Sequence, residues 1–300
     1  MRVLFAYDAS PGAALAASLL EAVALPPDSS IRVVSVVDPM PFMLAGAAAV
    51  GSAPPSYALQ EQIQSYLQSE LEAMVERLGR TSIPTSGTLL RGRPASVIVD
   101  DARDWGADLV VVGSRGHGQV ASLVLGSVSA EIVDDASSPV LVVRRPSLAR
   151  VVFAADGSSS SLAAGELLGR STLFDGCAIR VVSVVDVVEP WRTGIAPTMY
   201  AQAIDAFARD LDEARSVHQR IADDGVAALR AAGREADADV RSGDAAAEIV
   251  AAAVSWNADT IVMGSRGRSG LTRLLLGSVA RNVLHASATS VLIVREPTTA

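Results

Sequence analysis

One glycine-rich pattern occurs twice in this chain with the same internal spacing. The pattern is Gly-Ser-Arg-Gly, nine further residues and Gly-Ser, and its two copies begin at Gly113 and Gly264. Each copy follows an apolar run and precedes a stretch with helical periodicity. Glycine lets a backbone approach a ligand closely, and the free N–H groups and dipole of a helix N-terminus favour negative charge. The pattern therefore predicts two phosphate-binding loops, one in each half of the chain.

The rest of the chain repeats in the same order. The paired segments are 8–10 and 156–158, 32–38 and 180–186, 105–108 and 256–259, and 139–144 and 290–295. A length of 300 residues suggests two domains, and 50% hydrophobic residues are enough for a core in each. We therefore expect one domain over 1–146 and a second over 150–300.

Strand and helix patterns alternate within each half. In the first half, runs rich in Val and Leu fall near 2–7, 31–37, 86–90, 108–113 and 139–143. These runs are continuously apolar, as expected of parallel strands that are covered on both faces. Helical patterns lie between them, at 57–78, 94–105 and 127–136, and the second half has a long one at 199–232. The alternation predicts an α/β fold with a doubly wound parallel sheet in each half.

Composition excludes several classes of function. All 25 basic residues are arginine, so a Walker-type phosphate-binding lysine and a lysine Schiff base are both excluded. The net charge of −8 argues against a general nucleic-acid or membrane partner. Cys177 is the one cysteine, so an internal disulfide is excluded. The longest apolar stretch, 39–55, is broken by Pro and Gly, and we expect a cytoplasmic protein.

Polar and apolar residues stand where ligands bind in doubly wound sheets, at the carboxyl ends of the strands. Asp8 ends the first strand, Val36 and Asp38 end the second, and Gly113 ends the fourth. If the first strand lies between the second and the fourth, these tips meet at one crevice. A carboxylate there can accept hydrogen bonds from a ribose or an adenine amino group, and a valine can contact the base.

Each of these residues also has a simpler structural interpretation. Asp8 and its partner Asp156 can cap the following helix, and Asp38 can be a solvated loop residue, as can Asp186. The arginine of each loop can point at phosphate or into solvent. A single glycine loop can be a turn, whereas two copies with identical spacing favour a binding role. The three histidines have no metal-ligand spacing, and we expect neither a metal site nor a catalytic residue.

Together, the loop after the fourth strand and the aspartate after the first resemble the universal stress protein family in its ATP-binding branch. The resemblance covers nearly the whole chain as two tandem domains. It implies five-stranded parallel sheets in the order 3-2-1-4-5, with the two halves related by a pseudo-twofold axis through their final strands. It also implies which residues contact the nucleotide. In the first half they are Asp8, Val36, Val112, Gly113, Gly116, Gly126, Ser127 and Val128. In the second half they are Asp156, Val184, Met263, Gly264, Gly267, Gly277, Ser278 and Val279.

The function implied by the resemblance is a stress-response protein that binds an adenine nucleotide in each half with little or no turnover. The ligand is ATP, ADP or AMP, with a divalent metal on the phosphates. A homodimer and a protein effector are further implied partners. The alternative is a slow ATPase, or a phosphoryl or adenylyl transferase of a related adenine-binding fold, although the loops hold no obvious catalytic base. A third possibility, a structural pseudo-dimer that has lost its ligand, is disfavoured because both loops are intact.

Overall fold

The computed structural model describes residues 1–38, 57–116, 125–186, 200–267 and 276–296. The chain divides into two compact units, Met1–Ser147 and Leu148–Ala300. The apolar stretch 39–55 and Met199 lie outside the described residues. Within the described part of the chain, every helix is too short or too polar to cross a membrane.

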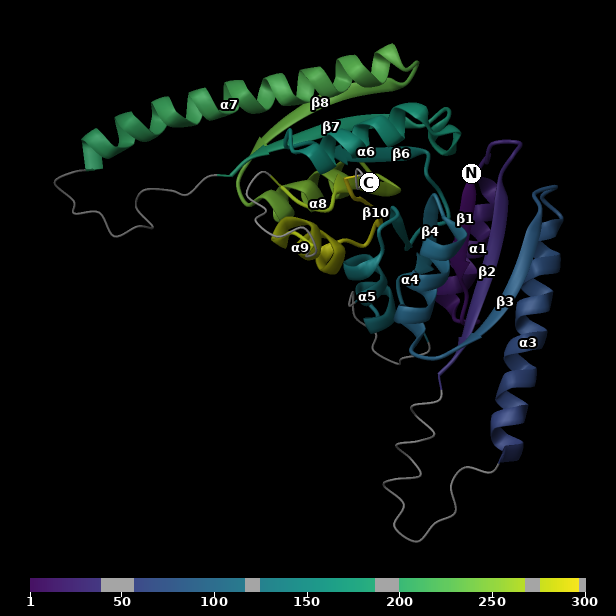
Figure 1. Cartoon of the computed structure of the whole chain (residues 1–300). Coiled ribbons are helices and arrows are strands. Elements are labelled where there is room, and N and C mark those ends of the chain that lie inside the picture. The colour runs from purple at the N-terminus through teal and green to yellow at the C-terminus, as the bar shows by residue number, and fades with distance from the viewer. Residues whose placement is uncertain (39–56, 117–124, 187–199, 268–275, 297–300) are drawn as a thin grey trace, which may run out of the picture. The chain divides into compact units, whose positions relative to one another are not determined.

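The described part of unit 1 is a parallel sheet in the order β3-β2-β1-β4-β5, covered by helices on both faces (Figure 1). Its strands are β1 (Arg2–Ala6), β2 (Ser30–Val37), β3 (Thr85–Arg91), β4 (Leu109–Gly113) and β5 (Val140–Val143). One face carries α1 (Pro11–Ala22) and α3 (Tyr57–Gly79), and the other carries α4 (Pro94–Trp105) and α5 (Ser127–Asp135). The predicted fold class and strand order are confirmed for this unit.

Unit 2 repeats this arrangement in the order β8-β7-β6-β9-β10. Its strands are β6 (Arg150–Ala154), β7 (Ala178–Val185), β8 (Glu235–Ser242), β9 (Thr260–Gly264) and β10 (Ser290–Val294). One face carries α6 (Ser159–Arg170) and α7 (Tyr200–Ala231), and the other carries α8 (Ala245–Ser255) and α9 (Ser278–Ala286). A short 3-10 helix, η1 (Thr172–Phe174), follows α6. The pseudo-twofold relation between the units stays a prediction.

The central strands read as continuous apolar runs because both of their faces are buried. Val110, Val111 and Val112 are 0–2% exposed in β4, and Ile261 and Val262 are fully buried in β9. Helices on each side exclude water from these strands, so alternation between polar and apolar residues is not required. This placement leaves the strand tips as the positions where polar groups can gather.

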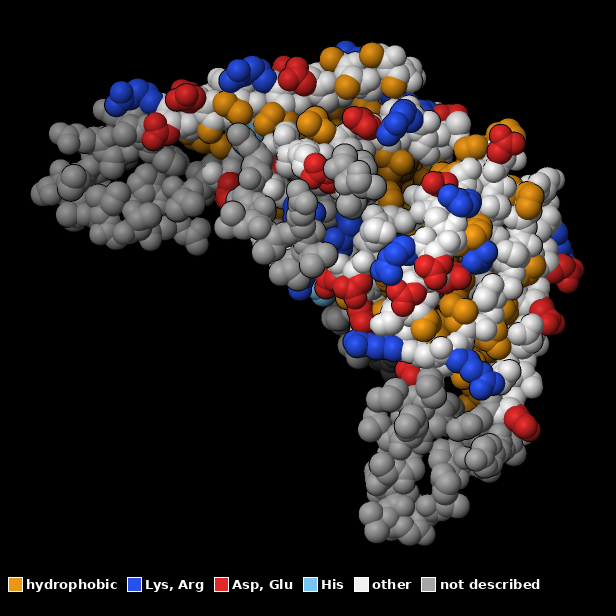
Figure 2. Space-filling model, viewed as in Figure 1, with side chains coloured by type: hydrophobic (Ala, Val, Ile, Leu, Met, Phe, Trp, Pro, Cys, Tyr) orange, Lys and Arg blue, Asp and Glu red, His pale blue; other side chains and the backbone are white. Residues whose placement is uncertain are grey.

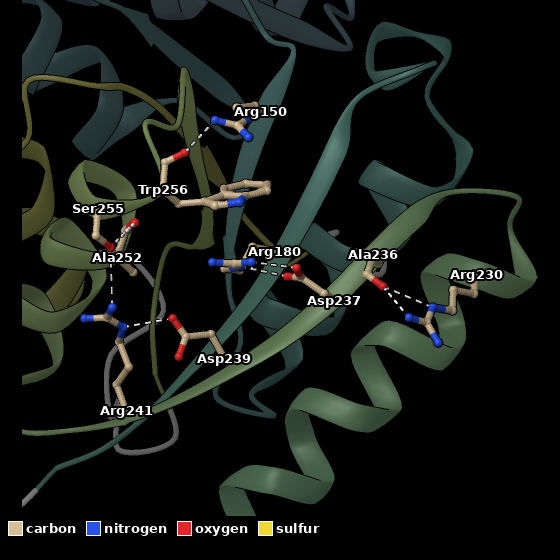
Figure 3. A network of polar contacts seen from close by, with 10 residues as sticks. All are labelled: Arg150, Arg180, Arg230, Ala236, Asp237, Asp239, Arg241, Ala252, Ser255 and Trp256. Atoms are coloured by element: carbon tan, nitrogen blue, oxygen red, sulfur yellow. Dashed lines mark hydrogen bonds and ion pairs between the residues drawn. The ribbon is translucent and has the colours of Figure 1, made fainter.

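The repeated tryptophan has a structural role in both units. In unit 2 the Arg180 guanidinium lies 4.8 Å from the centre of the Trp256 ring and donates two hydrogen bonds to Asp237, of 2.8 and 2.7 Å (Figure 3). In unit 1 the Arg32 guanidinium lies 4.4 Å from the centre of the Trp105 ring. A guanidinium over an aromatic face is an attractive arrangement. The contact joins β2 to the carboxyl end of α4 in unit 1, and β7 to the carboxyl end of α8 in unit 2.

Charged groups of both signs are interspersed on the surface seen in Figure 2. On this face, the described basic side chains stand singly or beside acidic ones, with hydrophobic side chains between them. Many pair locally, as Arg93 does with Glu131 at 3.0 Å and Arg170 with Glu166 at 3.3 Å. Exposed pairs of this kind contribute little to stability, about 0–1 kcal/mol.

Candidate functional site

A cavity of about 470 Å³ opens at the carboxyl ends of β1, β2 and β4 in unit 1. Parallel strands bring these ends to one edge of the sheet, and β1 lies between the other two. All the residues predicted for the first site line this cavity. They are Asp8, Val36, Val112, Gly113, Gly116, Gly126, Ser127 and Val128. Strand order, which places β1 at the centre, is the reason that they meet.

A second cavity, of about 280 Å³, occupies the same place in unit 2. It is lined by all the residues predicted for the second site. They are Asp156, Val184, Met263, Gly264, Gly267, Gly277, Ser278 and Val279. The structure therefore brings both predicted sets together, and nucleotide binding by them stays a prediction.

The first glycine of each loop is required by close packing against the helix that follows the first strand. A Cβ on Gly113 would lie 2.5 Å from the carbonyl carbon of Gly12 and 2.7 Å from the amide nitrogen of Ala13. On Gly264 it would lie 2.7 Å from the carbonyl carbon of Ser160. Ordinary carbon contacts are about 3.5–4.0 Å, so only glycine lets strand and helix approach so closely.

The second glycine of each loop faces the aspartate on the first strand. A Cβ on Gly116 would lie 2.7 Å from Oδ2 of Asp8, and one on Gly267 would lie 2.9 Å from Oδ2 of Asp156. Neither glycine is among the described residues with a left-handed φ. Space beside the carboxylate, and not an unusual backbone angle, is therefore what a side chain would remove.

The two aspartates are partly engaged by their own turn. Oδ1 of Asp8 accepts a hydrogen bond of 3.0 Å from the Ser10 amide, and Oδ1 of Asp156 accepts one of 3.0 Å from the Ser158 amide. Ser10 and Ser158, not the aspartates, are the N-caps of α1 and α6. The turn fixes Oδ1, whereas Oδ2 is directed toward the glycine loop.

The helix after each loop begins without a side-chain cap. Gly126 is the N-cap of α5 and Gly277 that of α9, and neither supplies a side-chain acceptor for the first-turn N–H groups. The amide of Gly126 donates to the Ser114 carbonyl at 2.9 Å, and the amide of Gly277 donates to the Ser265 carbonyl at 2.8 Å. These bonds close the loop, and they leave the helix N-terminus facing the cavity. Such an end attracts anions.

Two arginines add positive charge beside the first loop. Arg115 lines the cavity and is exposed. Burial, with a smaller effect of Arg115, lowers the pKa of Arg144 to about 10, so its guanidinium is charged at neutral pH.

Asp38 and Asp186 are not among the residues that line either cavity. The interpretation of these two as loop residues away from the site is therefore favoured.

Sequence reasoning missed the wall that α4 and α8 contribute. Pro94 and Ile98 line the first cavity, and Ala245 and Ile249 line the second. In each pair the residues are four apart at the start of a helix, so they share one helix face. The sequence signal that could have identified this wall is that both positions of the first pair recur as apolar residues in the second half at the same distance along the chain.

In both units the N-cap serine donates to the carbonyl of the loop arginine, Ser10 to Arg115 at 3.0 Å and Ser158 to Arg266 at 3.1 Å, and the second loop has one further contact. The buried Ser160 hydroxyl donates to the Arg266 carbonyl at 2.6 Å and accepts from the Arg266 amide at 3.3 Å. Gly12 holds this position in unit 1. His117 and Arg268, which occupy the same position of the two loops, lie outside the described residues. Among the residues that the structure does describe, groups of three or more His, Cys, Asp or Glu that could hold a metal ion are absent.

Comparisons with known proteins agree with this architecture. The model of the universal stress protein family matches residues 1–144 and 148–295. A universal stress protein of Thermus aquaticus is 36% identical over 143 residues, which are 47% of this chain and 97% of the relative. One of Mycobacterium tuberculosis is 28% identical over 294 residues, 89% of this chain and 86% of the relative. The crystal structure of a universal stress protein from Archaeoglobus fulgidus has a TM-score of 0.67 at 20% identity and covers 98% of both chains.

Proposed function

Because the chain belongs to the universal stress protein family in both of its halves, we propose that each half binds one adenine nucleotide in a stress response. The proposal rests above all on one observation. In each unit an uncapped helix N-terminus and a strand-tip carboxylate face each other across one cavity. An anion suits the helix N-terminus, and hydrogen-bond donors of a nucleoside suit the carboxylate.

Different parts of each cavity lining suit different parts of the nucleotide. Buried apolar side chains form one wall, where Val112 is 2% and Met263 is 5% exposed, and they suit an adenine ring. The glycine loop and the start of α5 or α9 suit the phosphates. Oδ2 of Asp8, or of Asp156, suits the ribose or the adenine amino group. The first cavity falls within the usual range of small-molecule sites, about 300–1,000 Å³, and the second lies just below it.

ATP, ADP and AMP all carry the groups that this arrangement recognises. We propose that a divalent cation, where present, enters with the phosphates. Turnover is slow in this proposal because Asp156 is assigned to the adenosine and the loops hold no obvious catalytic base. The alternative is a slow ATPase or a phosphoryl or adenylyl transferase. A homodimer, a protein effector and a cytoplasmic location remain predictions from the sequence.

Isothermal calorimetry with ATP on the full chain tests this function. The unmodified protein is expected to bind about two ATP per chain, because it has two loops. Asp156→Ala should weaken the second site by about 1–3 kcal/mol, the usual cost of losing a charge-assisted hydrogen bond. Affinity for inorganic triphosphate should hardly change, because that ligand lacks adenosine.

Asp186→Ala is the matched control, because Asp186 is an exposed carboxylate on the same unit that does not line the cavity. It should leave ATP binding unchanged. A stoichiometry of zero for the unmodified protein would refute the nucleotide proposal. If Asp156→Ala bound ATP normally but lost a measurable hydrolysis rate, Asp156 would be a catalytic group and the enzyme alternative would replace this one.

A further inference from the structure

Unit 2 has a groove of about 880 Å³ between α6 and α7, on the face of the sheet opposite to α8 and α9. Its floor reaches Phe153, a core residue that is 3% exposed. Gly165 lines it from α6, and Gly225 and Ile221 line it from α7. Leu162, at 62% exposure, also lines the groove. Figure 2 shows hydrophobic side chains between α7 and the rest of unit 2.

Unit 1 offers a built-in comparison, because equivalent residues can be identified from strand register. Ile31 pairs with Thr85 in unit 1, and its repeat partner Ile179 pairs with Ala236 in unit 2. Residues with a left-handed φ recur at the same places before and after the paired strands, Ser82 and Gly92 in unit 1 and Gly233 and Gly243 in unit 2. Positions of α3 and α7 therefore correspond at a constant offset, with the buried Leu78 and Leu229 as one pair.

Two of the three side chains that fill the floor in unit 1 are replaced by Ala or Gly in unit 2. Tyr7 is 8% exposed, and its hydroxyl lies 3.3 Å from a carboxylate oxygen of Glu70 on α3. Met74 is 5% exposed on the same helix. The equivalents in unit 2 are Ala155, Ile221 and Gly225, all of which line the groove.

An ion pair closes the rim in unit 1 and is also missing in unit 2. Arg77 of α3 donates to both carboxylate oxygens of Glu21 on α1, at 2.8 and 2.6 Å. The equivalents are Ala228 on α7 and Gly169 on α6, and both line the groove. Unit 2 therefore lacks two of the floor side chains and both rim side chains that fill this place in unit 1. A glycine inside a long helix costs about 0.5–1 kcal/mol relative to alanine, and unfilled apolar space adds to that cost.

The charges around the groove indicate what could fill it. Charged side chains among its lining residues are those of Glu166, Arg170 and Asp224. Glu166 and Arg170 bond each other at 3.3 Å and are 66% and 78% exposed, so both remain in water at the rim. The floor offers apolar carbon and no charge to match an ion. We propose that the α6–α7 groove binds an uncharged, largely apolar small molecule, and its volume lies within the range of such sites.

This proposal does not rest on nucleotide binding, because most of the groove lining comes from α6 and α7, although Ala155 lines both the groove and the second site cavity. The test is a fluorescence titration of the full chain with N-phenyl-1-naphthylamine, a neutral apolar probe that brightens away from water. The unmodified protein should bind about one probe per chain, in a saturable way, since one groove is present in the described part of unit 2.

Two variants restore the side chains of unit 1. Gly225→Met adds a side chain at the floor, where its Cβ would lie 3.2 Å from a methyl carbon of Val181, and Ala228→Arg with Gly169→Glu rebuilds the rim pair. Each should lower probe affinity by at least about tenfold, because the apolar surface that the probe would cover is then occupied. Ala228→Arg alone is a second rim variant whose folding is not in question, since position 228 is exposed on a helix. Val254→Met is the control, because Val254 is 68% exposed on α8, outside the groove. It should leave probe affinity unchanged.

Three results would overturn the proposal. One is the absence of saturable probe binding to the unmodified chain. Another is unchanged probe affinity in Gly225→Met and in both rim variants. The last is a change from dimer to monomer in sedimentation when the groove is filled, without any probe binding to the unmodified chain. That result would make the groove an interface between copies of this chain.

Discussion

The close packing of the first loop glycine predicts a large effect from a single methyl group. In Gly113→Ala the new Cβ would stand 2.5–2.7 Å from backbone atoms of Gly12 and Ala13. These atoms belong to the first turn of α1, which Ser10 caps and which packs on β4, so they cannot turn aside as a side chain can. Relief requires that β4 and α1 separate by about 1 Å to reach ordinary contact distance.

The expected cost is about 1–3 kcal/mol, the usual range for overpacking a well-packed interior. Gly79→Ala is the matched control in the same unit, because a Cβ there would have nothing within 4 Å. Gly79 is the last residue of α3, so alanine should stabilise unit 1 by about 0.4–1 kcal/mol. The two glycine-to-alanine changes are therefore expected to have opposite signs.

Native-state hydrogen exchange, read by mass spectrometry, would measure both effects. Peptides from β1 and β4 should exchange about tenfold faster or more in Gly113→Ala if the cost exceeds about 1.4 kcal/mol. Peptides from β6 and β9 serve as the reference within the same molecule. Unchanged exchange in β1 and β4 of a folded Gly113→Ala protein would refute the close-packing argument.

Three further predictions concern single residues. Gly267→Val should lower the stoichiometry of ATP binding from about two to about one per chain, because the side chain meets the Asp156 carboxylate; an unchanged value in calorimetry would show that the loop is only a turn. Cys177 is buried, and burial raises the pKa of its thiol to about 11. Ellman's reagent should therefore modify it slowly near neutral pH in the native chain and fully in urea. Equal modification rates in the native and the urea-unfolded chain would contradict the burial of Cys177. Burial, and next the Glu70 carboxylate, raise the pKa of Tyr7 from 10.0 to about 12. The contribution of the Tyr7 hydroxyl to the free energy of unfolding is therefore complete below pH 10 and is lost between pH 10 and 12. In urea titrations across this range, the Tyr7→Phe protein should not show this loss of stability.

The sequence by itself determined the fold class and the composition of both candidate sites. The repeated segments predicted two units, and continuous apolar runs such as 108–113 predicted parallel strands buried on both faces. The apolar runs are local signals, because each depends only on the order of residues within one element. The predicted site residues met in space because the strand order implied by the family resemblance puts β1 between β2 and β4.

The tertiary structure alone explained why particular residues are needed. Gly113 is required by its distance to Gly12, about one hundred residues away in the chain, and no local pattern contains that distance. Ser160 acts on the second loop through Arg266, again far along the chain. The contribution of Pro94 and Ile98 to the site follows from how α4 packs, which periodicity shows only as an apolar face.

The α6–α7 groove illustrates the same limit most clearly. Ala155, Gly225 and Ala228 are unremarkable in the sequence, because small residues suit strands and helices in many settings. They form a groove only because they stand where Tyr7, Met74 and Arg77 stand in unit 1, and only packing brings the end of β6 and the helix α7 together. A sequence records which side chains are present, whereas a cavity is the space that no side chain reaches, and that depends on every neighbouring element at once.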